Sequence, residues 1–179
     1  MLQMMKQIRF VFYTVCFFFW SFAVLAGSWN VITSEEFEKK MSDESQQETE
    51  THQLGNVKII RQRLPEIIVH ILFKPGSAEI ADTFSKKQLD EVGKALSSEG
   101  LAKYSFEIAG HTDSAGSEKL NLKLSKQRAN AIKEYLCMKY KILPEKLIAK
   151  GYGESMPVAS NDTIAGRAKN RRVVIKRIK

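Results

Sequence analysis

The stretch GHTDSAGSEKLNLKLSKQRANAIKEYL, residues 110–136, decides the fold. It directly follows residues 104–109, where Tyr, Phe and Ile alternate with Ser and Glu in the period of a β-strand. Its first part, residues 110–117, is rich in Gly and Ser and predicts a loop. Between residues 118 and 140 apolar side chains recur with a helical spacing, so we expect a long helix there. A strand that leads through a polar loop into a helix is typical of a sheet covered by helices.

The flanking sequence repeats this alternation of strands and helices. Residues 67–73, IIVHILF, form a β-branched run that predicts a buried strand. Residues 82–96 have the apolar spacing of a helix, with Asp82 or Thr83 as its N-cap. The remaining expected elements are a short strand at 147–150, a polar loop at 154–168 and a final strand at 173–178. The order β-α-β-α-β-loop-β predicts an α/β protein in which helices pack on a sheet.

The N-terminus has the composition of an export signal. Lys6 and Arg9 precede an apolar run, residues 10–26, that ends in Val24-Leu25-Ala26. A charged start, an apolar middle and small residues before the cut are typical of a signal peptide, here residues 1–26. The alternative is an uncleaved membrane anchor, although the run is at the short end for a spanning helix. Both interpretations place the following residues outside the cytoplasm.

Residues 27–56 are interpreted as a polar, flexible tether. They are rich in Ser, Glu, Gln and Thr and poor in apolar residues, so they bury too little surface to offset the entropy of ordering. Such a segment carries no pocket residue, and we expect the domain that begins at residue 57 to bind without it. The alternative for residues 35–41 is a short amphipathic helix.

Charge is segregated along the chain. Residues 35–50 contain seven acidic residues and two lysines, whereas residues 51–179 contain 24 Lys and Arg against 13 Asp and Glu. A strongly basic domain predicts an anionic partner, and export argues against nucleic acid as that partner. Cys137 is the only cysteine after residue 26, so no internal disulfide is expected in the exported part.

Asp113 and Arg128 are the residues in this stretch whose charged side chains could bind a ligand. Asp113 lies in the loop that follows a strand, where ligands bind in such sheets. Arg128 comes 15 residues later on the predicted helix, which can return its guanidinium to the loop. The two groups either form a simple ion pair or clamp a zwitterion, Asp113 taking an ammonium and Arg128 a carboxylate. Their spacing alone leaves both interpretations open.

Residues 110–136 closely resemble the signature of OmpA-like peptidoglycan-binding domains, of the OmpA, MotB and Pal type. Further matching pieces lie downstream: Gly151-Tyr152-Gly153-Glu154, Pro157, Asn161-Asp162-Thr163, Gly166-Arg167 and Asn170-Arg171-Arg172-Val173. The resemblance spans residues 67–178, within a domain expected over residues 57–179. It implies a β-α-β-α-β-β sandwich with a mixed sheet and helices packed on it.

The resemblance also implies a ligand and a site. Domains of this family recognise the diaminopimelate residue of the peptidoglycan stem peptide. Asp113 matches the aspartate that takes the ligand's ammonium, and Arg128 matches the arginine that takes its carboxylate. The other matching positions are Asn121, a polar lining residue, Arg171, a further basic residue, and Thr112, Leu124 and Ser125 near the pocket. The loop at residues 73–78 departs from the commonest family pattern, which puts its contacts in doubt.

These observations predict a non-catalytic module that anchors to the wall from the periplasm. Outer-membrane association and inner-membrane anchoring both remain open. No nucleophile with its base is apparent, and the three histidines lack a metal-ligand spacing, so we expect no enzyme activity, metal or cofactor. The rivals are a peptidoglycan enzyme and a wall-anchoring subunit of a motor or secretion complex. A basic C-terminal cluster is interpreted mainly as a solvated face: Lys169, Arg171, Arg172, Lys176, Arg177 and Lys179.

Overall fold

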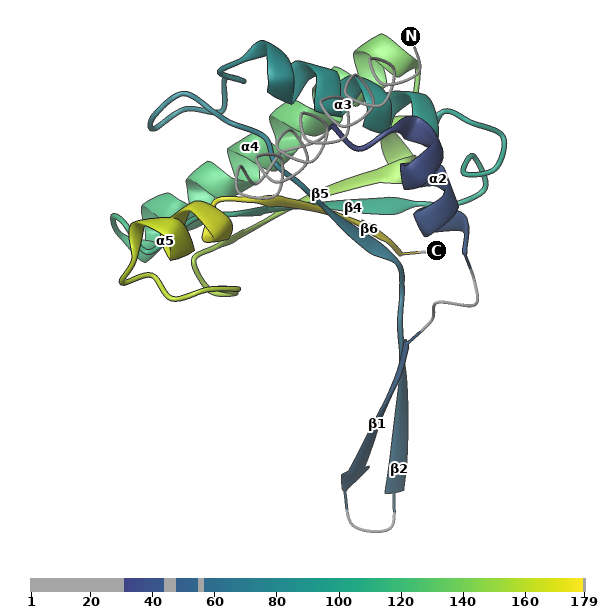
Figure 1. Ribbon diagram of the computed structural model, residues 1–179, viewed down its shortest axis with the longest axis horizontal. Helices are drawn as coiled ribbons and strands as arrows, with labels where there is room; N and C mark the ends of the chain where they lie inside the picture. The colour runs from purple at the N-terminus through teal and green to yellow at the C-terminus, as the bar shows by residue number, and fades with distance from the viewer. Residues whose placement is uncertain (1–30, 44–47, 55–56, 179) are drawn as a thin grey trace, which may run out of the picture. The chain divides into compact units, whose positions relative to one another are not determined.

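A four-stranded mixed sheet forms the centre of the protein (Figure 1). The computed structural model describes residues 31–43, 48–54 and 57–178. The sheet has the order β3 (Glu66–Val69), β6 (Val173–Arg177), β4 (Phe106–His111), β5 (Leu147–Gly153). β6 runs antiparallel to both of its neighbours, while β4 and β5 are parallel. The predicted mixed sheet is confirmed.

Two long helices, α3 (Thr83–Leu96) and α4 (Glu118–Tyr140), cover one face of this sheet (Figure 1). The core lies between the layers, where the largest buried side chains include Leu89, Val92, Ile108, Ile132, Leu136 and Ile175. Asp82 caps α3 by accepting a 2.6 Å hydrogen bond from the Ser85 amide. α4 has the predicted bounds and ends where Lys141 adopts a left-handed conformation, φ 57°. Both predicted helices are therefore confirmed.

Two predicted segments differ in detail. The first strand ends at Val69 rather than at residue 73, because the chain turns away and the Leu72 amide donates to the Ser85 hydroxyl at 2.8 Å. The polar loop at 154–168 contains the beginning of a two-turn helix, α5 (Ile164–Asn170), which Thr163 caps through the Gly166 amide. Its seven residues are too few for a helical spacing of apolar side chains to be recognised in the sequence. A 3-10 turn, η1 (Pro144–Lys146), precedes β5.

Part of the predicted tether belongs to the folded body. The structure has the helical alternative, α2 (Ser34–Ser42), in which Phe37 and Met41 are fully buried. Thr33 and Glu36 form a capping box at its start. The side chain of Arg177 donates to the Met41 carbonyl at 2.8 Å. A flexible tether is therefore wrong for this stretch, since two large apolar side chains at helical spacing supply the burial that the remaining polar residues lack.

Between α2 and β3 lies an antiparallel hairpin of β1 (Glu48–Leu54) and β2 (Val57–Arg63). The polar composition of β1 had indicated coil, but a Gly-Asn pair between two strands is a hairpin signal. The proposed signal peptide and its cleavage site lie outside the described residues. Within the described ranges, no helix is long and apolar enough to cross a membrane.

Candidate functional site

The site is built where β4 and β5 end beneath the first turns of α4. Close packing is possible because glycines face the helix: a Cβ on Gly110 would lie 2.3 Å from the carbonyl oxygen of Ser125, and one on Gly151 would lie 2.4 Å from the Lys126 amide. The Ser125 hydroxyl accepts from the Gly153 amide at 2.9 Å. Helix and strands are thereby held in a fixed register around the loop that follows β4.

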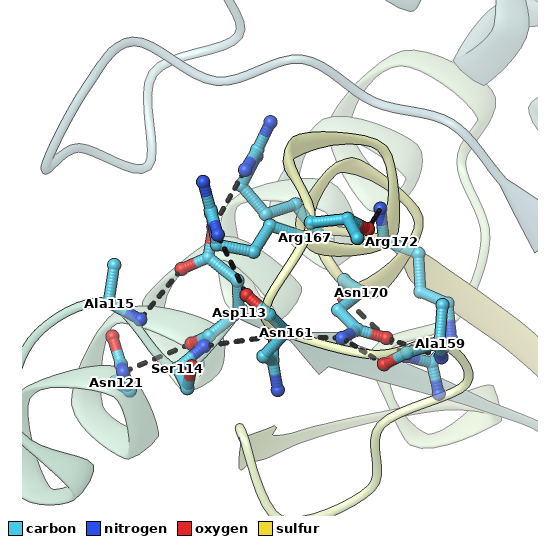
Figure 2. Close-up of polar contacts among 12 residues, drawn as sticks. Asp113, Ser114, Ala115, Asn121, Ala159, Asn161, Arg167, Asn170 and Arg172 are labelled. Carbon is cyan, nitrogen blue, oxygen red and sulfur yellow. Dashed lines mark hydrogen bonds and ion pairs between the residues drawn. The ribbon is translucent and has the colours of Figure 1, made fainter.

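Asp113 lies in that loop and is 8% exposed. Its Oδ1 accepts from the Ala115 amide at 3.0 Å, which shapes the turn. Its backbone carbonyl accepts from the Asn121 side chain at 3.2 Å (Figure 2). Its Oδ2 lies 2.6 Å from Arg171 Nη1. The carboxylate is thus fixed by its own loop and paired with Arg171, not with Arg128.

Arg128 approaches the site from α4. Its Nε donates to the Ser77 carbonyl at 3.0 Å, and its guanidinium carbon lies 4.9 Å from the centre of the Phe73 ring. Burial lowers the pKa of Arg128, the charge of Arg171 lowers it further, and the charge of Asp113 acts in the opposite direction. Asp113, Arg128 and Arg171 therefore share one electrostatic environment. The loop whose contacts the sequence left in doubt contributes a ring face and a backbone oxygen.

Asn121, which the sequence predicts to line the site, is 5% exposed. Its Nδ2 donates to Glu154 Oε2 at 2.6 Å as well as to the Asp113 carbonyl. Glu154, the last residue of the Gly-Tyr-Gly-Glu motif, was not predicted to be part of the site. One amide group consequently connects the Asp113 loop, α4 and the end of β5.

A second network supports the loop from α5 and was also missed by the sequence analysis. Asn161 Oδ1 accepts from the Ser114 amide at 3.3 Å and from Asn170 Nδ2 at 2.8 Å (Figure 2). Asn170 is fully buried and its Oδ1 accepts from two amides of the loop before α5. Arg167 donates to the Asn161 carbonyl at 2.8 Å. The matching Asn161 and Asn170 motifs were the available signal, but sequence alone did not show that they meet.

The three remaining predicted positions have different environments. Ser125 is fully buried between α4 and β5, so it supports the site rather than lining it. Leu124 is partly buried. Thr112 is 5% exposed, and its hydroxyl has no hydrogen-bond partner among the residues the structure describes.

The basic C-terminal cluster is only partly a solvated face. Arg172 is 6% exposed and donates to the Met156 carbonyl at 3.0 Å. Arg177 is 3% exposed, with its guanidinium carbon 4.5 Å from the centre of the Tyr104 ring. The solvated interpretation is wrong for these two residues, because backbone carbonyls and a ring face replace their water. In the described part of the chain, no three His, Cys, Asp or Glu residues are grouped as metal ligands.

Comparison with known proteins identifies a family. The profile described as "OmpA family" matches residues 72–171. Outer membrane porin F of Pseudomonas fluorescens is 55% identical over 67 residues, which are 37% of this chain and 20% of porin F. The putative lipoprotein YfiB of Escherichia coli is 37% identical over 91 residues, 51% of this chain and 56% of YfiB. The chain thus spans about a fifth to about half of the length of these relatives.

Solved structures give the same assignment. The cell wall anchor of the T6SS from Pseudomonas aeruginosa has a TM-score of 0.53 and 26% identity, over 75% of this chain and 89% of the anchor. The peptidoglycan-associated lipoprotein from Burkholderia pseudomallei has a TM-score of 0.53 and 25% identity, over 60% of this chain and 88% of the lipoprotein. The similarity therefore extends from the loop motif to the whole sheet with its covering helices.

Proposed function

The chain belongs to the OmpA family, and from this premise we propose that it binds peptidoglycan non-covalently and acts as a non-catalytic wall anchor. The names of its structural relatives support this proposal, since one is a cell wall anchor and another is peptidoglycan-associated. The observation that carries it is the ion pair that Asp113, in the loop after β4, forms with Arg171, together with Arg128, whose pKa responds to both of these charges. A site with charges of both signs suits a ligand that is itself a zwitterion.

Within peptidoglycan, we propose the diaminopimelate residue of the stem peptide as the ligand. Its side chain ends in one carbon that carries both an ammonium and a carboxylate. Asp113 is rigidly held and offers an acceptor for the ammonium. The Arg128 guanidinium lies over the Phe73 ring and donates a hydrogen bond through its Nε, while its two terminal nitrogens have no hydrogen-bond partner among the described residues. They form the fork that a carboxylate takes in a bidentate contact.

Sedimentation with purified sacculi tests this function. The full-length chain should pellet with diaminopimelate-containing sacculi, and Asp113→Ala or Arg128→Ala should weaken binding about tenfold or more, because each leaves a charge of the ligand without its partner. Arg128→Lys should also bind poorly, since an ammonium cannot form the fork.

Matched controls are Glu99→Ala and Lys87→Ala, which remove one exposed charge of each sign at positions away from the site. They should bind as the wild type does. The diaminopimelate clamp is refuted if folded Asp113→Ala and Arg128→Ala both pellet as well as wild type. The same incubation addresses catalysis: soluble muropeptides released by the wild type would indicate an enzyme.

The likeness to the T6SS wall anchor favours a second role that is compatible with the first. We propose that wall binding can serve to anchor a larger envelope assembly on the periplasmic side. Crosslinking in cells followed by purification should then recover a defined protein partner, and recovery of peptidoglycan fragments alone would contradict this role.

A further inference from the structure

A cleft of about 200 Å³ lies where α3 ends, β4 begins and α4 ends. Three of the side chains that line it, Leu96, Leu101 and Phe106, are buried and belong to the core. Tyr140 and Leu143 also line it, and Leu143 is 55% exposed. We call it the Tyr140 cleft. Its apolar lining suits a ligand group that is itself apolar.

The Tyr140 ring has a fixed position in the absence of a ligand. Its hydroxyl donates to Asp90 Oδ1 of α3 at 2.8 Å. The same oxygen accepts from the Tyr135 hydroxyl and the Lys139 ammonium, each at 2.6 Å. The ring itself packs on the backbone of Gly93, where a Cβ would overlap it. Both helices therefore hold this wall, and a ligand group can enter with little rearrangement.

The volume of the Tyr140 cleft limits what can enter it. Pockets for small ligands usually measure about 300–1,000 Å³, whereas a cavity of about 150 Å³ admits a single benzene ring. At about 200 Å³, the cleft has room for one large apolar side chain. Single side chains that fill a pocket in this way commonly anchor one protein on another.

The apolar surface of the cleft is accompanied by cations. Among the described residues that line it there are two lysines, Lys141 and Lys146, and no Asp or Glu. Lys103 adds an ammonium 4.9 Å from the centre of the Tyr104 ring, which also lines the cleft. No carboxylate of the described residues lies within ion-pair distance of these three lysines. An apolar side chain with acidic neighbours would complement such a surface.

We propose that the Tyr140 cleft is a docking site for a partner protein, which inserts one large apolar side chain from an acidic segment. A second copy of this chain does not offer that segment. Its acidic stretch, residues 35–50, contains two large apolar residues, Phe37 and Met41, and both are buried in their own core.

The docking site is separate from the site in the loop that carries Asp113. β4 runs from Phe106, which lines the cleft, to His111, which precedes that loop. At roughly 3.3 Å per residue the two ends of the strand are about 17 Å apart. One face of the protein can therefore hold the partner while the other end of β4 is occupied.

Fluorescence anisotropy of labelled peptides with the full-length chain tests the docking site. The probes are Asp-Glu-Phe-Glu-Asp, the same peptide with Ala in place of Phe, and Lys-Lys-Phe-Lys-Lys. Wild type should bind the acidic phenylalanine peptide about tenfold or more tightly than either of the others, because only this peptide supplies both the ring and the negative charges. Sedimentation with phosphatidylglycerol vesicles measures binding to an anionic lipid surface.

Variants of the cleft should change this preference. Lys141→Glu combined with Lys146→Glu should reverse it, so that the basic phenylalanine peptide binds more tightly than the acidic one. Ala102→Trp, at an exposed lining position, should weaken the acidic phenylalanine peptide about tenfold by filling the cleft. The matched control is Lys86→Glu combined with Lys87→Glu, which changes two exposed lysines near the start of α3 and should bind as wild type does. Circular dichroism establishes that each variant is folded.

The other outcomes overturn the proposal. Equal binding of the acidic phenylalanine and alanine peptides would leave only a basic surface. An unreversed preference in the double glutamate variant, or unchanged binding by Ala102→Trp, would place the peptide elsewhere. If wild type binds no peptide but binds vesicles, and the double glutamate variant does not, the cleft contacts lipid instead. Sedimentation with sacculi is independent of these results, so the proposed wall binding is decided separately.

Discussion

At the scale of single residues, His111 shows how the site is supported by groups that do not touch a ligand. The ring is 5% exposed and stacks on Tyr152 with centroids 5.3 Å apart. The Tyr152 hydroxyl in turn donates to Glu107 at 2.7 Å. Burial, with a contribution from the charge of Arg172, lowers the pKa of His111 to about 4, while Glu107 opposes the shift. The folded protein therefore favours the neutral form of His111, which is the last residue of β4 before the loop that carries Asp113.

This predicts a loss of stability in mild acid. The folded pKa of His111 is depressed, so the unfolded chain takes up a proton below about pH 6.5 while the folded chain does not until about pH 4. The free energy of unfolding should fall by about 2 kcal/mol between pH 7 and pH 5 from this residue. Urea denaturation at several pH values measures it. His111→Phe should keep the stack and lose most of the slope. Part of what remains comes from His70, whose pKa burial also lowers. An identical slope in the variant would exclude His111 as its source.

The sequence predicted candidate residues for the site, but it did not predict which of them form pairs. Asp113 and Asn121 follow from a motif, and so does the presence of Arg171. The pairing of Asp113 with Arg171 rather than with Arg128 does not follow, because it depends on how two loops 58 positions apart meet. Glu154 was missed for the same reason, since its role arises only where the end of β5 meets α4.

At the scale of elements, α4 was the easiest one to predict, but its position depends on the strands beneath it. Its 23 residues give a long periodic signal, and Ser117 and Lys141 mark its ends. The sequence did not predict α5 or the β1–β2 hairpin. These elements are short and largely polar, so their sequences could not be distinguished from coil. The position of α4 over the sheet depends on glycine backbones that a periodic pattern does not reveal.

Gly110→Ala should therefore destabilise the contact between α4 and β4. Its Cβ would lie 2.3 Å from the backbone oxygen of Ser125, which cannot move without the helix. We expect a loss of about 2–3 kcal/mol in the free energy of unfolding, the upper part of the range for overpacking. Gly76→Ala is the comparison: no atom lies within 4 Å, and only its φ of 62° costs energy, about 1 kcal/mol. Equal midpoints in urea for the two variants would show that the helix yields.

At the scale of the whole molecule, the folded unit begins earlier than its family motif. α2 adds Phe37 and Met41 to the core and gives Arg177 its carbonyl acceptor. The sequence missed this because two apolar residues in a polar segment do not outweigh its composition. The burial of Arg177 was missed with it, since the alternation of the last strand indicated a solvated cation.

A chain shortened to begin at Val57 should consequently be less stable than one that begins at Val31. Loss of Phe37 alone removes a side chain whose deletion from a core typically costs about 3–5 kcal/mol. The shorter chain should unfold at lower urea and bind sacculi less well, whereas the longer one should match the full-length chain. Superimposable denaturation curves for the two would restore the interpretation of residues 27–56 as a dispensable tether.

Arg177 has a mechanical consequence. Its backbone amide donates to the Pro65 carbonyl at 2.9 Å, and its guanidinium donates to the Met41 carbonyl at 2.8 Å. Arg177 thus binds the chain on both sides of the segment that contains the β1–β2 hairpin. A force applied to the chain at Thr33 is therefore transmitted through α2 to β6. The segment with the β1–β2 hairpin does not bear this force while the bond between Arg177 and Met41 holds. Under rising tension on Thr33, we therefore expect the first event to be the shearing of α2 from the core.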